Sequence, residues 1–252
     1  MVSRAQAARQ PKHVATEKRV SVVIPAYNEE KHIVSTLRDV HEYLTRKKEP
    51  FEIIVVDDGS SDGTAFLVRR IATELGCIKL ITYSPNRGKG YAVKRGVLSA
   101  SGKYILISDA DLSTPIDESD KLIALCRESA DIVFGSRGLA DSKIETRQTF
   151  SRFLMGRIFN LMVRVIALPG VYDTQCGFKC LKKDAAHSLF DSLVTNRFAF
   201  DVELLMRAKR EGYVIKEVPI RWRDIQPSTV RPLSDAIEMF IHLLKIRRLL
   251  KK

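Results

Sequence analysis

Cysteine and histidine are scarce in this sequence, and their placement argues against two classes of site. The four cysteines include no CxxC pair, so neither a zinc site nor a disulfide framework is expected. The five histidines are scattered, which leaves carboxylate oxygens as the expected ligands of any metal ion. The cysteines are Cys77, Cys126, Cys176 and Cys180, and the histidines are His13, His32, His41, His187 and His242. We therefore expect reduced cysteines that pack in the core.

Long apolar runs are missing as well. The first residues contain no apolar segment, so a signal peptide is not expected. The most hydrophobic later stretch is interrupted by Arg157, Asn160 and Arg164, whereas a membrane span needs about 20 predominantly apolar residues. Its apolar residues recur at helical spacing, at Phe150, Phe153, Leu154, Ile158, Leu161, Met162 and Val165. This helix can face the core with one solvated side, or lie at an interface where its arginines meet lipid phosphates.

Acidic residues are outnumbered, 30 against 42 lysines and arginines, which gives a net charge of +12. This charge suits an anionic partner such as nucleic acid, a nucleoside diphosphate or a phospholipid surface. We expect a flexible basic arm at residues 1–19, one domain at residues 20–225, and a basic amphipathic helix at residues 226–252. The apolar stripe of that helix consists of Ile237, Phe240, Ile241 and Leu244. It can lie on an anionic bilayer or pack on its own domain.

Short apolar runs alternate with helical patterns along most of the chain. Strands are expected at residues 21–25, 52–57, 79–83, 104–109, 131–137 and 217–222, the last of which would close the sheet. Helices are expected near residues 30–47, 64–75, 90–100 and 116–129. The alternation predicts βαβ crossovers and hence an α/β fold with a mostly parallel sheet.

Two aspartates, Asp109 and Asp111, follow one of these strands directly. Side chains two residues apart point to the same side of an extended backbone, so both can reach one hard divalent cation. Acidic pairs also occur in turns that only face solvent, so the pair alone does not establish a metal site. Two earlier strands support it, because they run into AYNEE at residues 26–30 and DDGSSDGT at residues 57–64. The carboxyl ends of parallel strands form the ligand-binding edge of an open α/β sheet.

Six motifs then occur in a familiar order: PAYNEE, VVDDGSSDGT, NRGKGYAVKRG, DADLSTP, GSR and DTQCGFK. In this respect the chain resembles the family 2 glycosyltransferases of the GT-A fold. DTQCGFK, followed by FAFDVELL at residues 198–205, resembles the dolichyl-phosphate or polyprenyl-phosphate glucosyltransferase branch. The resemblance implies a GT-A, Rossmann-like, mostly parallel sheet flanked by helices, with amphipathic interfacial helices toward the C-terminus. It also implies that residues 20–225 are the GT-A catalytic domain.

For the nucleotide, the resemblance implies contacts by residues at the ends of the early strands and near the acidic pair. These residues are Pro25, Ala26, Tyr27, Glu29, Asp57, Asp58, Lys89, Asp109 and Ala110. A carboxylate can accept a hydrogen bond from a base NH, and a tyrosine ring can cover the base. Alternatively, Asp58 caps the next helix, and the glycines around Lys89 serve only a tight helix entry.

For the chemistry, the resemblance implies that Asp109 and Asp111 bind Mg²⁺ or Mn²⁺, which bridges the donor phosphates. Ser113 stands where the mannosyl branch often has a glutamine ligand, so the resemblance does not supply a third protein ligand, and water or donor oxygens would complete the shell. Arg137 is expected near the reacting phosphates, with an ion pair to Asp141 or Glu145 as the alternative.

Two further carboxylates are expected to act on the acceptor. Asp173 would position the acceptor or take its proton, and Asp201 is a further catalytic candidate that can instead belong to a core helix. The implied reaction is a single displacement with inversion at the anomeric carbon.

The expected function is transfer of glucose from UDP-glucose to a polyisoprenyl (dolichyl) phosphate at the cytoplasmic face of a membrane. The protein would be cytoplasmic and attached peripherally, with no nucleic-acid partner. Mannosyl transfer from GDP-mannose, or a non-lipid acceptor, are the alternatives. A nucleotidyltransferase would need a Gly-rich phosphate loop after the first strand, where this chain has PAYNEE. A nucleic-acid-binding module would explain the charge but not the aligned carboxylates.

Overall fold

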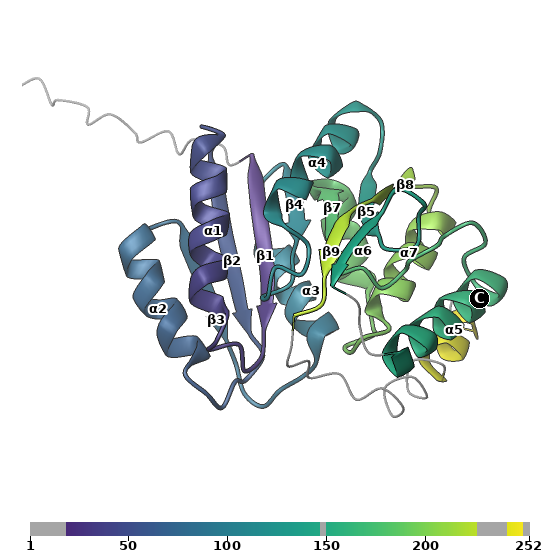
Figure 1. Ribbon diagram of the computed structural model, residues 1–252, viewed down its shortest axis with the longest axis horizontal. Coiled ribbons are helices and arrows are strands. Elements are labelled where there is room, and N and C mark those ends of the chain that lie inside the picture. Colours follow the sequence, from purple (N-terminus) through teal and green to yellow (C-terminus); the bar gives the residue numbers. More distant parts are fainter. Residues whose placement is uncertain (1–18, 147–149, 226–240, 249–252) are drawn as a thin grey trace, which may run out of the picture.

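The computed structural model describes residues 19–146, 150–225 and 241–248, and a seven-stranded sheet lies at its centre (Figure 1). The strands are β1 (Val20–Ala26), β2 (Phe51–Asp57), β3 (Ile78–Thr82), β4 (Tyr104–Ile107), β5 (Ile132–Ser136), β7 (Lys179–Lys182) and β8 (Ile215–Pro219). Their order in the sheet is β3-β2-β1-β4-β7-β5-β8. Strand β7 runs antiparallel to both of its neighbours, and the remaining pairs are parallel. The predicted α/β fold with a mostly parallel sheet is confirmed.

Helices cover both faces of this sheet, as expected from the βαβ pattern (Figure 1). They are α1 (Ile33–Arg46), α2 (Thr64–Leu75), α3 (Lys89–Ser99), α4 (Ser119–Glu128), α5 (Phe150–Ile166), α6 (Lys183–Ser192) and α7 (Phe200–Arg210), with a 3-10 turn, η1, at Ile116–Glu118. The predicted bounds of α2 are confirmed, whereas α1 begins three residues later than expected. The helix expected from residue 116 is confirmed from Ser119 onward, after η1.

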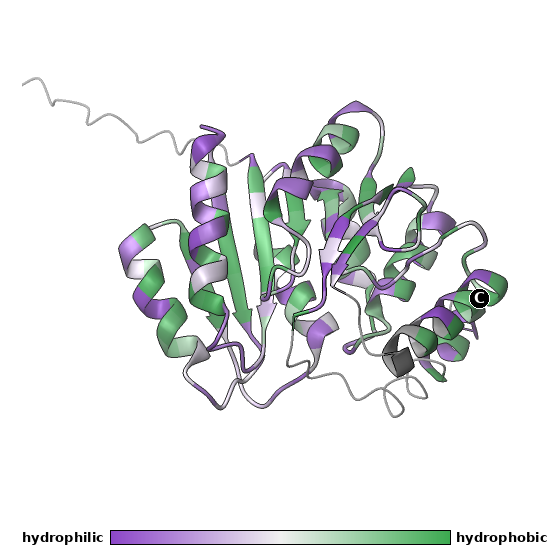
Figure 2. Cartoon of the chain, viewed as in Figure 1, coloured by the Kyte–Doolittle hydropathy of each residue, from purple (hydrophilic) through white to green (hydrophobic). Residues whose placement is uncertain are grey.

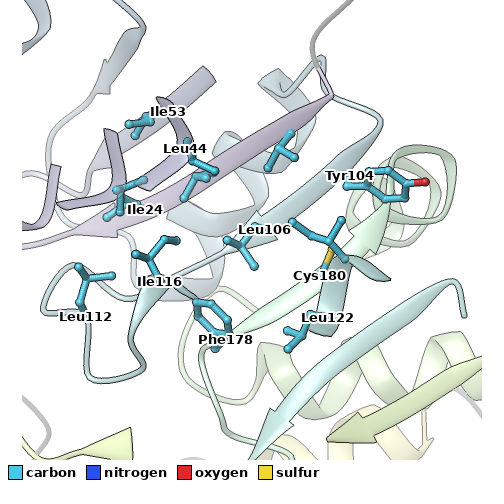
Figure 3. Close-up of a cluster of buried hydrophobic side chains, with 14 of the residues drawn as sticks. Ile24, Leu44, Ile53, Tyr104, Leu106, Leu112, Ile116, Leu122, Phe178 and Cys180 are labelled. Atoms are coloured by element: carbon cyan, nitrogen blue, oxygen red, sulfur yellow. The ribbon is translucent and has the colours of Figure 1, made fainter. Parts of the chain in front are cut away.

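The core forms two layers, one on each face of the sheet, because alternate side chains of each strand point to opposite faces. On one face, Ile24 and Leu106 pack with Leu44 of α1 and Leu122 of α4 (Figure 3). On the other face, the neighbouring residue Val23 packs in a cluster with residues of α3, α6 and α7. Burial on both faces explains why the strands read as continuous β-branched runs (Figure 2). Each fully buried Val, Leu or Ile contributes about 1.5–3 kcal/mol.

The strand predicted at residues 217–222 is wrong as a single element. Strand β8 ends at Pro219 on the edge of the main sheet, and β9 (Arg221–Arg223) pairs instead with β6 (Lys143–Thr146) in a second, two-stranded sheet. Proline has no amide hydrogen to continue the ladder, which favours a break at this point. The carbonyl of Ile220 then accepts a hydrogen bond from the Lys143 amide at 3.0 Å. The break brings Trp222 out of the main sheet and, as described below, to the side of Arg137.

Helix α5 turns four residues of its predicted apolar stripe outward, whereas Met162 of the same stripe packs against the core. Its residues Leu154, Ile158, Leu161 and Val165 are 45%, 49%, 58% and 75% exposed, whereas Val163 is buried. The alternative of an ordinary core-facing stripe is therefore wrong for these four residues. No helix in the described part of the chain is both long enough and apolar enough to span a bilayer.

The last described residues, 241–248, are also helical and lie beside α5 in Figure 1. Leu243 and Ile246 are buried, while Ile241 and Leu244 are exposed. Part of the predicted apolar stripe therefore faces outward. The predicted basic arm and most of the predicted C-terminal helix, including Ile237 and Phe240, fall outside the described residues.

None of the four cysteines forms a disulfide, and three of them are buried. The prediction of reduced packing cysteines is confirmed.

Candidate active site

The carboxyl ends of β1, β2 and β4 bring the predicted acidic segments to one edge of the sheet (Figure 1). The Asp58 amide donates to the Ala26 carbonyl at 2.8 Å, which joins the ends of β1 and β2. The Thr36 hydroxyl of α1 donates to the Ala110 carbonyl at 2.6 Å and so fixes the turn between Asp109 and Asp111. The predicted edge therefore exists.

Three carboxylates crowd together there: Glu29, Asp109 and Asp111. Burial, followed by the charges of Asp111 and Asp109, raises the pKa of Glu29 to about 7. Burial and the charge of Asp109 also raise the pKa of Asp111. Neighbouring carboxylates that raise each other's pKa create a negative potential, and such a potential is expected at a site that accepts a cation. Among the described residues, however, no group of three or more His, Cys, Asp or Glu is arranged to hold a metal by itself.

The donor set fits a hard divalent ion that takes its remaining ligands from a bound diphosphate. Asp111 is fixed because its Oδ1 accepts a hydrogen bond from the Ser113 amide at 2.8 Å. Mg²⁺ and Mn²⁺ are commonly held by one or two carboxylates plus substrate phosphates, so two aspartates suffice.

Lys89, the first residue of α3, enters the same site. Its Nζ lies 2.6 Å from Asp109 Oδ1, and the two side chains are 25% and 33% exposed. Burial alone would raise the pKa of Asp109, but the Lys89 ammonium outweighs it and lowers that pKa. A partly exposed ammonium at a helix N-terminus is well placed to contact a phosphate. Lys89 thus lies at the predicted acidic edge, and its contact with a diphosphate stays a prediction.

Asp58 is engaged inside the protein. Its carboxylate is 3% exposed and accepts hydrogen bonds from Asn86 Nδ2 at 2.9 Å, the Arg87 amide at 2.7 Å and the Gly88 amide at 2.8 Å. It does not cap α2, whose N-cap is Gly63, so that alternative is wrong. In this structure Asp58 shapes the turn that presents Lys89, and its contact with the nucleotide stays a prediction.

The glycine before Lys89 is required by conformation and by packing. Gly88 has a φ of +102°, and a Cβ there would lie 2.6 Å from the carbonyl oxygen of Asn196. The tight helix entry is therefore real, and it coexists with the Lys89 contact to Asp109.

The remaining residues predicted at the nucleotide lie along the same edge. Tyr27 is 38% exposed and can cover a base, Pro25 is half-buried, and Ala26 is buried. Asp57 Oδ1 accepts a hydrogen bond from the Ser60 amide at 3.2 Å. Contacts between these residues and a nucleotide stay predictions.

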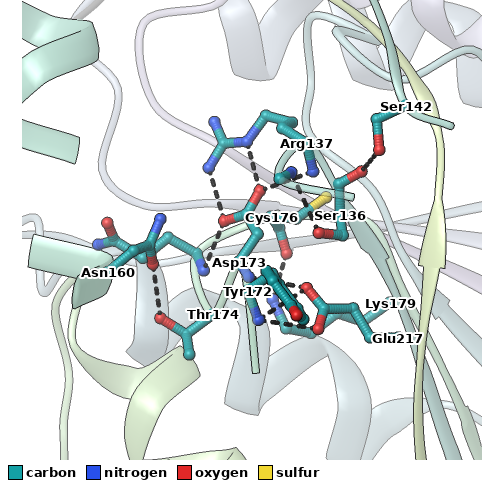
Figure 4. A network of polar contacts seen from close by, with 12 residues as sticks. Ser136, Arg137, Ser142, Asn160, Tyr172, Asp173, Thr174, Cys176, Lys179 and Glu217 are labelled. Carbon is teal, nitrogen blue, oxygen red and sulfur yellow. Dashed lines mark hydrogen bonds and ion pairs between the residues drawn. The ribbon is translucent and has the colours of Figure 1, made fainter. Parts of the chain in front are cut away.

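Arg137 follows β5 and forms a fork with Asp173 (Figure 4). Its Nε lies 2.6 Å from Asp173 Oδ2, and its Nη2 lies 3.0 Å from Oδ1. The Trp222 ring lies 5.4 Å from the guanidinium carbon. The alternative ion pair with Asp141 or Glu145 is wrong, because the side chain turns toward Asp173. The bidentate contact holds the Arg137 guanidinium in one orientation.

Asp173 itself is poorly placed to take a proton. It is 1% exposed, and besides Arg137 its carboxylate accepts hydrogen bonds from the amides of Arg137 and Gln175. Burial would raise the pKa of Asp173, but the Arg137 guanidinium outweighs it and lowers that pKa. A carboxylate with low proton affinity is a weak general base at neutral pH. Of its two predicted roles, the geometry favours positioning, exerted through Arg137.

Asp201 lies in α7 and is 4% exposed, so it does belong to a core helix. Its Oδ1 is 2.6 Å from Nζ of Lys179, a residue that the sequence reasoning did not single out. Lys179 is fully buried. The sequence feature that could have indicated this ion pair is the lysine that ends DTQCGFK, followed later in the chain by the aspartate of FAFDVELL.

Gly177 lets the DTQCGFK turn approach the acidic pair closely. A Cβ at this position would lie 2.6 Å from Asp109 Oδ1 and still closer to Oδ2. We expect Gly177→Ala to displace the Asp109 carboxylate and to weaken Mn²⁺ affinity in the presence of UDP about tenfold, as measured by electron paramagnetic resonance. Gly156→Ala is the control, because nothing lies within 4 Å of its Cβ position. Equal Mn²⁺ affinity in both variants would contradict this view of Gly177.

Comparison with known proteins agrees with this geometry. Residues 21–190 match the model of Glycosyl transferase family 2. The chain is 38% identical over 240 residues to a dolichyl-phosphate beta-glucosyltransferase of Dictyostelium discoideum, covering 90% of this chain and 73% of the relative. It is 38% identical over 244 residues to the protein of that name in Mus musculus, with 91% and 75% covered.

A solved structure shares the fold. Glucosyl-3-phosphoglycerate synthase from Mycobacterium tuberculosis, crystallised with Mn²⁺ and UDP-glucose, superposes with a TM-score of 0.66 at 22% identity, covering 91% of this chain and 79% of that one. This likeness extends the agreement from sequence motifs to the arrangement of the sheet and its helices. On the family match, the curated relatives and the acidic edge described above, this chain belongs to glycosyltransferase family 2.

Proposed function

We propose that this protein transfers glucose from UDP-glucose to a polyisoprenyl phosphate of the dolichyl type. The observation that carries the proposal is the meeting of the Asp109 and Asp111 pair with Lys89 at one sheet edge, where a diphosphate finds both a cation site and an ammonium. The names of the relatives at 38% identity support the sugar and the acceptor class.

The residues divide the work by charge. Glu29, Asp109 and Asp111 would attract Mg²⁺ or Mn²⁺, and the ion would supply Lewis-acid stabilisation of the departing diphosphate. Lys89 would contact the same diphosphate from the start of α3. Arg137, held in place by Asp173 through Nε and Nη2, would contact a phosphate of the acceptor or donor with its remaining guanidinium N–H groups.

The acceptor chemistry matches the absence of a strong base at Asp173. A phosphate monoester has a second pKa near 6, so its oxygen is largely ionised at neutral pH and can attack the anomeric carbon directly. The sugar would then be inverted in a single displacement, with the nucleoside diphosphate as leaving group. Asp173 needs only to orient Arg137 in this scheme.

We also propose that the outer face of α5 contacts the cytoplasmic face of a membrane, with the protein held there peripherally. This face presents Leu154, Ile158, Leu161 and Val165 to the outside, and the basic helix at residues 241–248 lies beside it. An exposed apolar stripe next to basic residues suits the headgroup region of an anionic bilayer.

The inner side of α5 is linked to the site. The Thr174 hydroxyl donates to Asn160 Oδ1 at 3.2 Å, next to Asp173 (Figure 4). The Arg164 guanidinium lies 4.5 Å from the centre of the Tyr172 ring, on the other side of Asp173 in the sequence. A lipid phosphate at this face would therefore approach the Asp173 and Arg137 fork.

The membrane proposal predicts a loss of lipid binding without a loss of nucleotide binding. The double variant Leu161→Glu/Val165→Glu is expected to bind vesicles of phosphatidylcholine and phosphatidylserine at least tenfold more weakly, since burying each apolar side chain contributes about 1.5–3 kcal/mol. Its UDP affinity should not change. The control, Phe66→Glu/Val214→Glu, alters exposed apolar residues elsewhere on the surface. Equal vesicle binding by both double variants would contradict a role for α5.

The proposed reaction is tested with a donor panel. The protein is incubated with Mn²⁺, a polyprenyl phosphate and radiolabelled UDP-glucose, UDP-galactose, UDP-N-acetylglucosamine or GDP-mannose, and the label in the lipid extract is measured. We expect label in the lipid from UDP-glucose. Transfer from GDP-mannose alone would replace the proposed donor, and label confined to the aqueous phase would replace the proposed acceptor.

A further inference from the structure

A lysine with no solvent exposure stands at the start of β7, beneath the acidic edge. The Lys179 ammonium lies 2.6 Å from Asp201 Oδ1 and donates to the carbonyl of Cys176 (Figure 4 shows Lys179 and Cys176). A buried charge is costly unless it is paired and hydrogen-bonded, and both conditions are met here. A lysine that served only to fill space could be replaced by an apolar residue, so its placement calls for an explanation.

The backbone position of Lys179 connects it to the ends of two strands that carry site residues. Lys179 pairs with Ile107, two residues before Asp109, and with Phe134, three residues before Arg137. The first residue of β7 thus lies where both segments leave the sheet. A shift of the turn that precedes Lys179 would therefore displace that turn relative to the segments that carry Asp109 and Arg137.

That turn is the part the ammonium holds. The Cys176 carbonyl, to which Lys179 donates, directly precedes Gly177, whose backbone lies against the Asp109 carboxylate. Asp173, three residues before Cys176, holds the Arg137 guanidinium. The charge of Lys179 also lowers the pKa of Asp173 and that of Asp109, though less than Arg137 and Lys89 do, respectively. One ammonium therefore supports both halves of the site.

We propose that Lys179 is a positioning residue: its ammonium, held by Asp201, ties down the turn at residues 173–177 and thereby fixes Asp109 and Arg137 relative to each other. Asp201 is then the counter-ion of Lys179, and neither residue touches the substrate. The proposal rests on the function proposed above for the reaction itself, but its geometric content concerns only this chain.

The test must separate positioning from simple charge compensation. Lys179→Met alone would leave Asp201 buried and unpaired, so the informative variant is Lys179→Met/Asp201→Asn, which removes both charges together. Replacing a buried ion pair by neutral groups is often nearly neutral for stability. Lys182→Met is the matched control, because Lys182 lies on the same strand and pairs with Asp131 at 3.1 Å at the surface.

We expect the double variant to unfold cooperatively at a temperature close to that of the wild type. Its kcat should fall roughly 30- to 100-fold with little change in KM for UDP-glucose, and its Mn²⁺ affinity in the presence of UDP should weaken about tenfold, as is typical when a residue behind a metal ligand is lost. Lys182→Met should behave as wild type.

Wild-type kcat and Mn²⁺ affinity in the double variant would overturn the proposal. So would loss of cooperative unfolding, because the pair would then serve stability. If the wild type transfers no sugar from any donor, the proposed function fails. The Mn²⁺ titration with UDP still decides the role of Lys179 in that case.

Discussion

Replacing Asp111 with asparagine is expected to lower the rate of glucosyl transfer about 1,000-fold or more without lowering the melting temperature. The rate should fall because the departing diphosphate loses the cation that takes up its charge. Stability should be unchanged or higher, since burial and the charge of Asp109 already raise the pKa of Asp111. The measurement is lipid-linked product formation at saturating Mn²⁺, with the melting temperature recorded for each variant.

The control for Asp111→Asn is Asp120→Asn. Asp120 is an exposed carboxylate in an ion pair with Lys47, and exposed pairs contribute only about 0–1 kcal/mol. The Asp120→Asn variant should transfer glucose at the wild-type rate. A variant at Asp111 that kept more than about one tenth of the metal-dependent rate would remove the acidic pair from the mechanism.

Arg137→Met is expected to lower both activity and stability. Asp173 is 1% exposed and would lose its counter-ion, which costs about 3–5 kcal/mol when a buried pair is broken from one side. The rate should fall about 100- to 1,000-fold, because the guanidinium proposed to contact phosphate is lost. Denaturant unfolding gives the first quantity and product formation gives the second.

Two further variants separate these effects. Arg137→Met/Asp173→Asn removes both charges and should recover much of the stability but none of the activity. Arg38→Met breaks a bidentate pair with Glu74 whose side chains are about half exposed, and should cost no more than about 1 kcal/mol. Recovery of activity in the double variant would mean that Arg137 acts only as the counter-ion of Asp173.

The chain's periodicity predicted most of the sheet because its strands are buried on both faces and contain runs of β-branched residues. Strand β7 escaped prediction for a specific reason. Its four residues, KCLK, begin and end with lysine. Nothing in the local pattern indicates that Lys179 forms an ion pair with Asp201 of helix α7. The break between β8 and β9 had a local sign, Pro219, that the pattern of apolar residues outweighed.

The orientation of α5 could not be read from spacing. Leu154, Ile158, Leu161 and Val165 recur every three or four residues whether the stripe faces a core or faces outward. The orientation is set by the packing of Val163, and of Leu168 just after the helix, against the domain, because this packing buries the other side of α5. Periodicity locates an amphipathic helix but does not say which medium covers its apolar face.

The sequence predicted which edge of the sheet carries the site residues, but it predicted fewer of the contacts between their side chains. Asp109, Asp111 and Lys89 lie together because strand ends and a helix start converge, which the βαβ order implies. The contact of Asp173 with Arg137 joins positions 36 residues apart, and the contacts of Asp58 with residues 86–88 join positions 28 to 30 residues apart. Such pairings depend on tertiary structure, and the local sequence pattern does not indicate them.

The most direct test of the account is the position of Mn²⁺ in crystals grown with UDP, located by its anomalous scattering. We predict one strong peak at roughly 2.1 Å from a carboxylate oxygen of Asp111 and in contact with the UDP diphosphate, with Lys89 Nζ also on the diphosphate. Bound UDP without a metal peak at this edge, or a peak at a different part of the surface, would contradict the account.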